Sequence, residues 1–174
     1  MNQYTIWFIT GSQDLYGDET LRQVAEDSSK IVEGFNKSPN ITLDVVFKPT
    51  ATTPGEITDL MMQANNDPDC AGIITWMHTF SPSKMWIEGF SLLRKPYLHL
   101  HTQYNREIPW STIDMDFMNL NQSAHGDREH GFIAARMNVP RKVIVGYWQD
   151  EDVQKRIDNW MKVAVAAGES RKLK

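Results

Sequence analysis

The chain contains 174 residues, of which 41% are hydrophobic and 23% are charged, and its formal net charge at pH 7 is −4. This length fits a single globular domain. The slight acidic excess argues against a nucleic-acid or anionic-membrane surface, since such surfaces need clustered Lys and Arg. The one basic cluster, RKLK at 171–174, is interpreted as a solvated tail.

The sequence carries no signal of export or membrane insertion. It opens with a strand-like run and not with a basic segment followed by an apolar one, so we expect no signal peptide. No apolar run approaches the roughly 18 residues that cross a bilayer. The single cysteine, Cys70, lies in the apolar run CAGIITWM and is expected to be a buried core residue. A reducing cytoplasm is the compartment we expect.

Five strand-then-helix units are predicted in chain order. The strands are apolar runs bounded by Pro, Gly or polar turns. They cover residues 4–9, 41–47, 70–76, 97–101 and 142–147. Runs that are apolar on both faces and alternate with amphipathic helices indicate a parallel sheet with helices on both faces. We therefore predict an α/β fold, a flavodoxin-like or Rossmann-like three-layer sandwich with five parallel strands.

The first three helices are predicted from their start signals. The first begins with Asp18 as its N-cap. The second begins with Thr53 as the cap, Pro54 in the first turn and Glu56 closing a capping box. Ser81 is the predicted cap of the third.

The two C-terminal helices differ in the strength of their pattern. A weaker pattern, interrupted by two glycines, covers roughly 118–137. The last helix is predicted over 150–167, with Gly168 as its stop. We interpret 1–174 as a single domain in which 168–174 begins a linker to a further domain.

Six Trp and nine Met are many for a chain of this length, because one domain has a limited core in which to bury them. We expect leftover apolar side chains to form a subunit or domain interface. Those in or beside predicted loops are Met77, Trp86, Trp110, Met115, Met118 and Trp148.

The carboxyl ends of the strands are where open α/β sheets bind ligands. In this sequence they are rich in amides, hydroxyls, imidazoles and aromatic rings, and poor in charge. The segment GSQDLYG after the first strand spaces its glycines six apart, so it matches neither G-x-G-x-x-G nor the P-loop. A phosphate-binding loop is therefore disfavoured.

The histidines do not form a metal-ligand motif. His99 and His101 alternate along a strand and share a face, but no third ligand accompanies them in sequence. His125 and His130 are five apart, about 140° around a helix, so their side chains cannot converge. His125 and Glu129 are four apart and can form a hydrogen-bonded pair.

Gln13 and Phe80 each admit two interpretations. Gln13 is either an exposed amide or backbone cap, or a donor and acceptor matched to a sugar hydroxyl. Phe80 is either a hydrophobic staple beside the next helix, or a ring stacked on the C–H face of a small polyol. Asp114 and Asp116 are the nearest approach to a carboxylate pair for acid–base chemistry, and we interpret them as caps.

Longer segments resemble a known family. WFITGSQDLYG, WMHTFSPSKMW, HTQYNREIPW, IDMDFMNLNQSAHGDREHGFIAARM and GYWQD closely resemble the N-terminal region of bacterial L-arabinose isomerases, and the resemblance runs from residue 4 to residue 174. It implies an aldose–ketose isomerase that converts L-arabinose to L-ribulose, with D-galactose to D-tagatose as a side activity. It also implies a hexamer with active sites between subunits, and a divalent metal, usually manganese (Mn²⁺), held by two glutamates and two histidines.

The resemblance also assigns residue roles. Family chains are much longer, and their metal ligands come from the part that follows this segment, so we expect no metal ligand here and no activity of this chain alone. Gln13, Leu15 and Phe80 match positions that line the sugar pocket. His125 matches a position offered to a neighbouring subunit's active site, where an imidazole can bind or move a proton at a sugar oxygen.

Two other classes of function remain as alternatives. A free-standing sugar-binding or regulatory α/β module would bind a polyol without chemistry. A flavodoxin or receiver domain is disfavoured, because the strand ends carry neither a phosphate loop for a flavin nor an acidic pair for phosphorylation. Neither nucleic acid nor a membrane is an expected partner.

Overall fold

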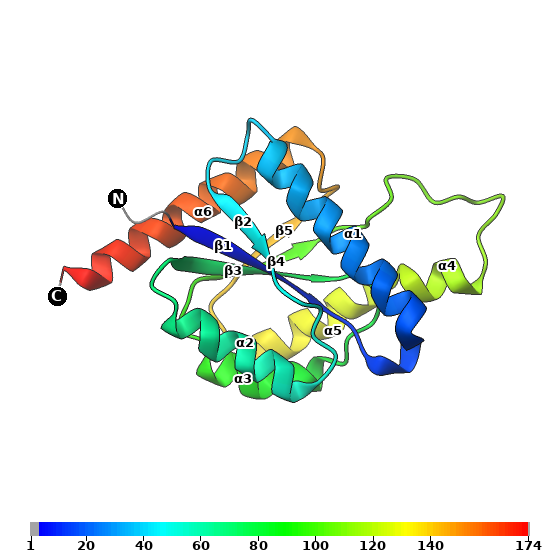
Figure 1. Ribbon diagram of the computed structural model, residues 1–174, viewed down its shortest axis with the longest axis horizontal. Helices are drawn as coiled ribbons and strands as arrows, with labels where there is room; N and C mark the ends of the chain where they lie inside the picture. The colour runs from blue at the N-terminus through cyan, green and yellow to red at the C-terminus, as the bar shows by residue number, and fades with distance from the viewer. Residues whose placement is uncertain (1–3, 174) are drawn as a thin grey trace.

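The computed structural model describes residues 4–173, which form three layers (Figure 1). The middle layer is a fully parallel five-stranded sheet in the order β2-β1-β3-β4-β5. Its strands are β1 (Thr5–Gly11), β2 (Asp44–Phe47), β3 (Cys70–Met77), β4 (Tyr97–His101) and β5 (Lys142–Val145). The order and the parallel pairing confirm the predicted flavodoxin-like fold.

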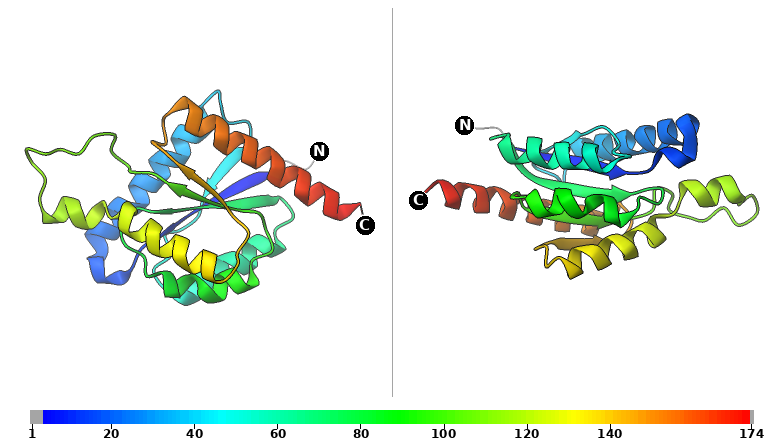
Figure 2. Two further views of the ribbon diagram at one scale, coloured as in Figure 1. Left: turned by 180° about the vertical axis from the view of Figure 1, so that it is seen from behind. Right: turned by 90° about the horizontal axis from the view of Figure 1, so that it is seen from below.

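Helices cover both faces of the sheet. Within the described residues they are α1 (Gly17–Lys37), α2 (Pro54–Asn66), α3 (Ile87–Leu92), α4 (Met115–Leu120), α5 (Ser123–Arg136) and α6 (Glu151–Lys172). The short 3-10 helices η1 (Asp14–Tyr16) and η2 (Ser83–Trp86) precede α1 and α3. Figures 1 and 2 show α1 and α6 on one face and α2, α3 and α5 on the other, while α4 stands away from both.

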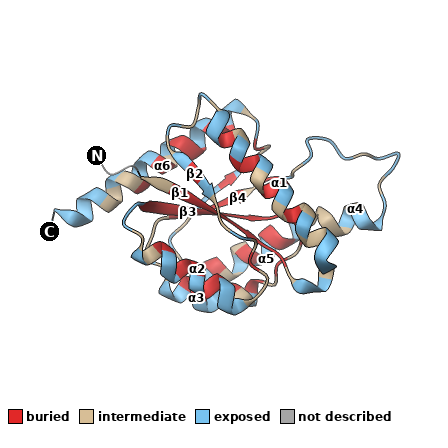
Figure 3. Cartoon of the chain, in the orientation of Figure 1, coloured by how far each residue is buried: buried red, intermediate tan, exposed pale blue. Residues whose placement is uncertain are grey.

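Each face of the sheet has its own apolar core. On one face, Phe35 of α1 and Ile157 of α6 pack around Trp76. On the other face, Met61 of α2 and Phe90 of α3 belong to a second cluster. The three central strands between them, β1, β3 and β4, are buried, as Figure 3 shows for β1 and β3, whereas the edge strands β2 and β5 are largely exposed. Since burial of one large apolar side chain contributes about 1.5–3 kcal/mol, these clusters are the main source of stability.

The capping box predicted at the start of α2 is confirmed. The hydroxyl of Thr53 accepts a hydrogen bond from the Glu56 backbone N–H, and the Glu56 carboxylate accepts one from the Thr53 N–H. The Thr52 backbone N–H and hydroxyl donate to the same carboxylate, and with the Thr53 bond they lower the pKa of Glu56. Local sequence chemistry is sufficient to begin this helix.

Two other predicted caps are wrong. Asp18 does not cap α1, because η1 leads directly into the helix and α1 already begins at Gly17. Ser81 does not cap α3: its hydroxyl accepts a hydrogen bond from the Trp86 indole N–H at 3.1 Å, and η2 separates it from the helix. Both misassignments involve the loops that follow β1 and β3 at one edge of the sheet.

The C-terminal helices also differ from the prediction. The helix expected over 118–137 is two helices, because the chain leaves the helical conformation at Asn121 (φ −106°, ψ 57°). Asp114 caps the first of them, α4, by accepting from the Phe117 N–H at 2.8 Å, as interpreted. The stop predicted at Gly168 is wrong, since α6 continues in helical conformation to Lys172.

Three strand boundaries shift by two residues or more. β1 extends to Gly11, where it still pairs with Met77 of β3. β2 begins only at Asp44, because the backbone N–H and hydroxyl of Thr42 both bind the Asp158 carboxylate of α6. β5 ends at Val145, since Gly146 turns the chain with φ 143°.

The predicted burial of the cysteine is confirmed, but only some of the apolar side chains expected at an interface are exposed. Cys70 is buried, as predicted, and burial raises the pKa of its thiol to about 11. Met77, Trp86 and Trp148 are core residues, which corrects the expectation that they would be left over. Trp110, Met115 and Met118 are exposed on the loop before α4 and on α4 itself. No helix within residues 4–173 is long and apolar enough to cross a membrane.

Candidate functional site

The loops that follow β1 and β3 are joined at the carboxyl edge of the sheet, where this fold class binds ligands. Ser12 and Thr79, one in each loop, are buried, and their hydroxyl oxygens lie 2.7 Å apart in a hydrogen bond. Gly11 allows the close approach: a Cβ there would lie 2.7 Å from both Ser81 Oγ and the Trp86 ring. A side chain at this position would force the two loops apart.

Phe80 and His125 come together above these loops. Their rings are stacked, with centroids 4.7 Å apart and an interplanar angle of 25°. Phe80 follows β3 and is partly buried, whereas His125 lies in the first turn of α5 and is exposed. Since both side chains are at least partly accessible to solvent, the pair can contact a C–H surface and a polar atom of one small ligand.

Gln13 and Leu15 lie on the neighbouring β1 loop. Gln13 precedes η1 in an extended conformation, and within residues 4–173 its side-chain amide makes no hydrogen bond. Leu15 is 84% exposed. No hydrogen bond, ion pair or ring contact within residues 4–173 joins either residue to the Phe80–His125 pair, so the four predicted residues share an edge of the sheet without a bond that links them all.

The start of α5 is anchored to the end of β3. The Gln122 N–H donates to the His78 carbonyl at 2.9 Å, and the Ser83 N–H donates to the Glu129 carboxylate at 3.0 Å. The second bond corrects the expectation that Glu129 pairs with His125. Both bonds hold the segment that carries His125 close to Phe80.

A buried carboxylate on α5 meets two imidazoles of β4. Asp127 Oδ1 accepts a hydrogen bond from His99 Nε2 at 2.6 Å. His101 Nε2 lies 3.0 Å from Oδ2, without the alignment of a hydrogen bond. The shared face predicted for His99 and His101 is confirmed by this common partner. Burial raises the pKa of Asp127, and the two imidazoles oppose that rise.

These three side chains do not form a metal centre. Within residues 4–173, no group of three or more His, Cys, Asp or Glu side chains is arranged to hold a metal ion. His99 Nε2 already donates to the Asp127 carboxylate, so this nitrogen is not free to bind a metal.

The polar cluster continues inward from His99. The Thr75 hydroxyl lies 2.8 Å from His99 Nδ1 and 2.9 Å from the Tyr97 hydroxyl, which in turn bonds to His130 Nε2. Burial lowers the pKa of His130 and raises the pKa of Tyr97, so both side chains are neutral near pH 7. The sequence did not reveal this network. Asp127 and His130 are three residues apart on one helix, and their partners, His99 and Tyr97, are two apart on one strand.

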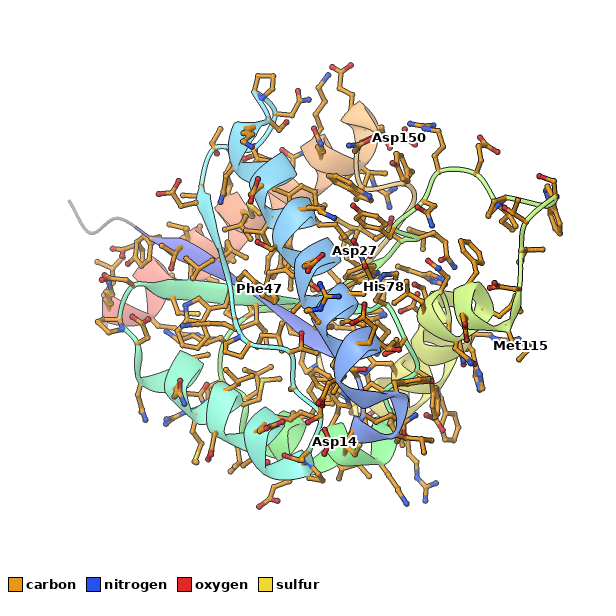
Figure 4. All side chains as sticks on the ribbon, turned by 45° about the vertical axis from the view of Figure 1, so that its right-hand side comes forward. Asp14, Asp27, Phe47, His78, Met115 and Asp150 are labelled. Atoms are coloured by element: carbon orange, nitrogen blue, oxygen red, sulfur yellow. The ribbon has the colours of Figure 1, made fainter. Side chains whose placement is uncertain are left out.

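A second buried polar pair lies on the opposite face. Asp27 of α1 and His78, just beyond β3, point toward each other (Figure 4), with Oδ2 3.0 Å from Nε2. Gln23 also donates to Asp27 at 2.9 Å, and His78 stacks on Trp76. This pair fixes α1 to the end of β3 and is sealed from solvent, so it is structural.

Two open features flank the Phe80–His125 pair. A cavity of about 360 Å³ lies beyond β4 and β5, and His101, Arg106 and Ala124 are among the residues that line it. Beside it, the loop after β4 and α4 project from the body as an arm (Figure 1). We define the arm as residues 103–120. Its exposed apolar side chains are Ile108, Trp110, Met115 and Met118.

Comparison with known proteins identifies related sequences. The model of the L-arabinose isomerase N-terminal domain family matches residues 1–172. The chain is 60% identical to an L-arabinose isomerase of Thermotoga petrophila over 171 residues, which are 98% of this chain and 34% of that protein. It is 60% identical to one of Geobacillus thermodenitrificans and 59% identical to one of Anoxybacillus flavithermus, in each case over all of this chain and 35% of the relative. The chain thus spans about a third of the length of these curated relatives.

Proposed function

The chain belongs to the L-arabinose isomerase N-terminal domain family, and from this premise we propose that it forms one wall of the sugar site of an isomerase that converts L-arabinose to L-ribulose. D-Galactose, which would give D-tagatose, is a second substrate of the same site in this proposal. The whole protein would be a cytoplasmic enzyme of carbohydrate metabolism.

The observation that carries the proposal is the stacked pair of Phe80 and His125 at the carboxyl edge of the sheet. An aromatic face suits the C–H surface of a sugar. The free amide of Gln13 and the imidazole edge of His125 suit its hydroxyls, because each can both donate and accept a hydrogen bond. Leu15 would contribute an apolar boundary to the same wall.

The wall needs an opposing surface. Leu15 is 84% exposed and His125 is exposed as well, so a sugar bound against these side chains would be covered by this chain on one side only. We propose that a second subunit supplies the other side, in a hexamer with shared active sites, and that the whole wall, His125 included, is offered to that neighbouring subunit's site. The exposed apolar arm is a surface of the kind that subunit contacts bury.

The metal of the reaction would come from the remaining part of the whole protein. We propose Mn²⁺ as the ion, and its chemistry would be to polarise the sugar carbonyl. This chain's own contribution is to bind and orient. Phe80 holds the carbon skeleton, Gln13 holds a hydroxyl, and His125 binds a sugar oxygen or moves a proton at it.

A chimera tests the proposal. Residues 1–174 would replace the aligned segment of the Geobacillus thermodenitrificans relative, and ketose formation from L-arabinose with Mn²⁺ would be measured. We expect the chimera to be active and the isolated chain to be inactive. A folded chimera that forms no ribulose, or an isolated chain that forms it, would contradict the proposal.

Substitutions in the chimera assign the roles. His125→Gln should lower kcat by about 10²–10⁴-fold, the usual contribution of a positioned acid–base group. Phe80→Ala should raise KM by about five- to tenfold, the equivalent of roughly 1 kcal/mol of ring contact. Phe132→Ala is the matched control, since Phe132 is exposed on the same helix as His125 and lies away from the edge. If the two Phe substitutions raised KM equally, the proposed contact between Phe80 and the sugar would be contradicted.

A further inference from the structure

The first half of α5 is held to the sheet by polar groups. Within the described residues, the buried positions of this helix are Ser123, Gly126, Asp127, His130 and Ala134. None of them has a large apolar side chain. At Gly126 the backbone approaches β3 so closely that a Cβ would lie 3.1 Å from the Met77 Cβ. The helix that carries His125 is therefore positioned by close backbone contact and directional bonds.

The hydrogen bonds under α5 have one consistent direction. With Asp127 as the accepting carboxylate, His99 must carry its proton on Nε2, so that its Nδ1 accepts from the Thr75 hydroxyl. Thr75 then accepts from the Tyr97 hydroxyl, and Tyr97 accepts from His130 Nε2. The chain of donors starts on α5, crosses β4 and β3, and ends on α5 again at Asp127.

This closed path makes the carboxylate the terminal acceptor on which the other bonds depend. If Asp127 is removed, His99 loses its partner at Nε2 in a site that is only 3% exposed, where an unpaired donor is costly. The imidazole can then change tautomer, which reverses the bond to Thr75. Directional bonds fix an angle, whereas apolar contacts tolerate small rotations.

We propose that Asp127 is a positioning residue for His125: by accepting from His99, it fixes the rotation of α5 that stacks the His125 imidazole on Phe80. Asp127 lies two residues after His125 on the same helix, so a rotation at one position moves the other. His101, beside the other oxygen and 33% exposed, places the cluster at the border of the cavity beyond β4. The importance of this for catalysis rests on the proposed sugar role of His125, but the positioning itself does not.

NMR of the 174-residue chain tests the positioning directly. The imidazole Cε1–H signal of His125 is displaced by the ring current of Phe80 when the rings are stacked. Phe80→Leu gives the position of the signal without the stack. Asp127→Ala should move the signal more than half of the way toward that position. Asp127→Asn retains an oxygen that can accept from His99, so it should leave the signal close to that of the unmodified chain.

Two further variants keep the test decisive. Asp116→Ala removes an exposed carboxylate from the neighbouring helix α4 and should leave the signal unchanged. If Asp127→Ala does not fold, as judged by circular dichroism, Thr75→Val replaces it: the shape is retained, the donor to His99 is lost, and we expect a smaller displacement in the same direction.

Three results would overturn the inference. They are an unmoved His125 signal in folded Asp127→Ala, an unmoved signal in Thr75→Val when the first variant does not fold, and equal displacement by Asp127→Asn and Asp127→Ala. The chimera distinguishes this failure from that of the proposed function. An inactive chimera would remove the sugar role and leave the NMR result standing, whereas an unmoved signal would leave the isomerase role standing.

Discussion

α6 and α5 pack on opposite faces of the same sheet, but different contacts hold them. α6 buries Val153, Ile157 and Met161 against the sheet. The first half of α5 buries Asp127 and His130 instead. Apolar packing supplies free energy without strict direction, whereas the polar contacts add little net stability and fix geometry. α6 also buries two polar side chains, but these bond to neighbouring loop segments, whereas the polar groups of α5 bond to side chains of the strands. The helix beside the candidate site is therefore the one that polar bonds fix to the sheet.

The largest expected effect on the free energy of unfolding is on the face of the sheet that α1 and α6 cover. Trp76→Ala removes a fully buried ring from the cluster between α1, α6 and the sheet and should lower the free energy of unfolding by about 3–5 kcal/mol. Urea denaturation measures the change, with the exposed Val163→Ala on α6 as the control. A loss of less than about 1 kcal/mol would show that this face does not carry the stability.

A smaller effect on the free energy of unfolding, which depends on pH, is expected under α5 on the other face of the sheet. Burial lowers the folded-state pKa of His130, so the unfolded chain binds the extra proton as the pH falls below about 6.5. The contribution of the neutral His130 to stability is therefore fully present above that pH. Below it, the free energy of unfolding falls by up to about 1.4 kcal/mol per pH unit.

Urea denaturation of the unmodified chain and of His130→Gln between pH 7 and pH 5 measures this dependence. The difference between the two free energies of unfolding should change in favour of His130→Gln as the pH falls. A constant difference across that range would mean that His130 does not carry the acid sensitivity of the α5 face.

The smallest effect on stability is expected in the arm, which belongs to neither face. Trp110 is 78% exposed, so Trp110→Ser should change the free energy of unfolding by less than about 0.5 kcal/mol. The same variant should weaken self-association, because an exposed Trp is a typical anchor of a subunit interface. Sedimentation equilibrium at high concentration measures the association. If the unmodified chain stays monomeric at high concentration, the arm is excluded as a contact between copies of this chain.

The fold followed from local and periodic features of the sequence. The apolar runs at 70–77 and 97–101 are buried between helices, and alternation of strands with helices leaves few topologies other than the observed one. The box formed by Thr53 and Glu56 is contained within four residues, so it could be read directly. The errors at Asp18, Ser81 and Gly168 arise where a tertiary contact or a continuing helix overrides a local signal.

The candidate site was less accessible to sequence reasoning. The residues themselves suggested Gln13 and Phe80 as possible sugar contacts, and the resemblance to a family added Leu15 and His125. No local pattern indicated that two of the four stack. Asp127 was missed because its partners, His99 and His101, are separated from it by a long loop and a short helix.

The sequence by itself determined the parallel sheet, its helical layers and the polar character of the edge where the strands end, because hydrophobic period and turn chemistry act over a few residues. Only the tertiary structure decided which polar groups meet. Contacts such as Ser12 with Thr79, and His99 with Asp127, join residues 67 and 28 positions apart. Their geometry depends on how close two backbones come, and that distance is set by packing of the whole sheet.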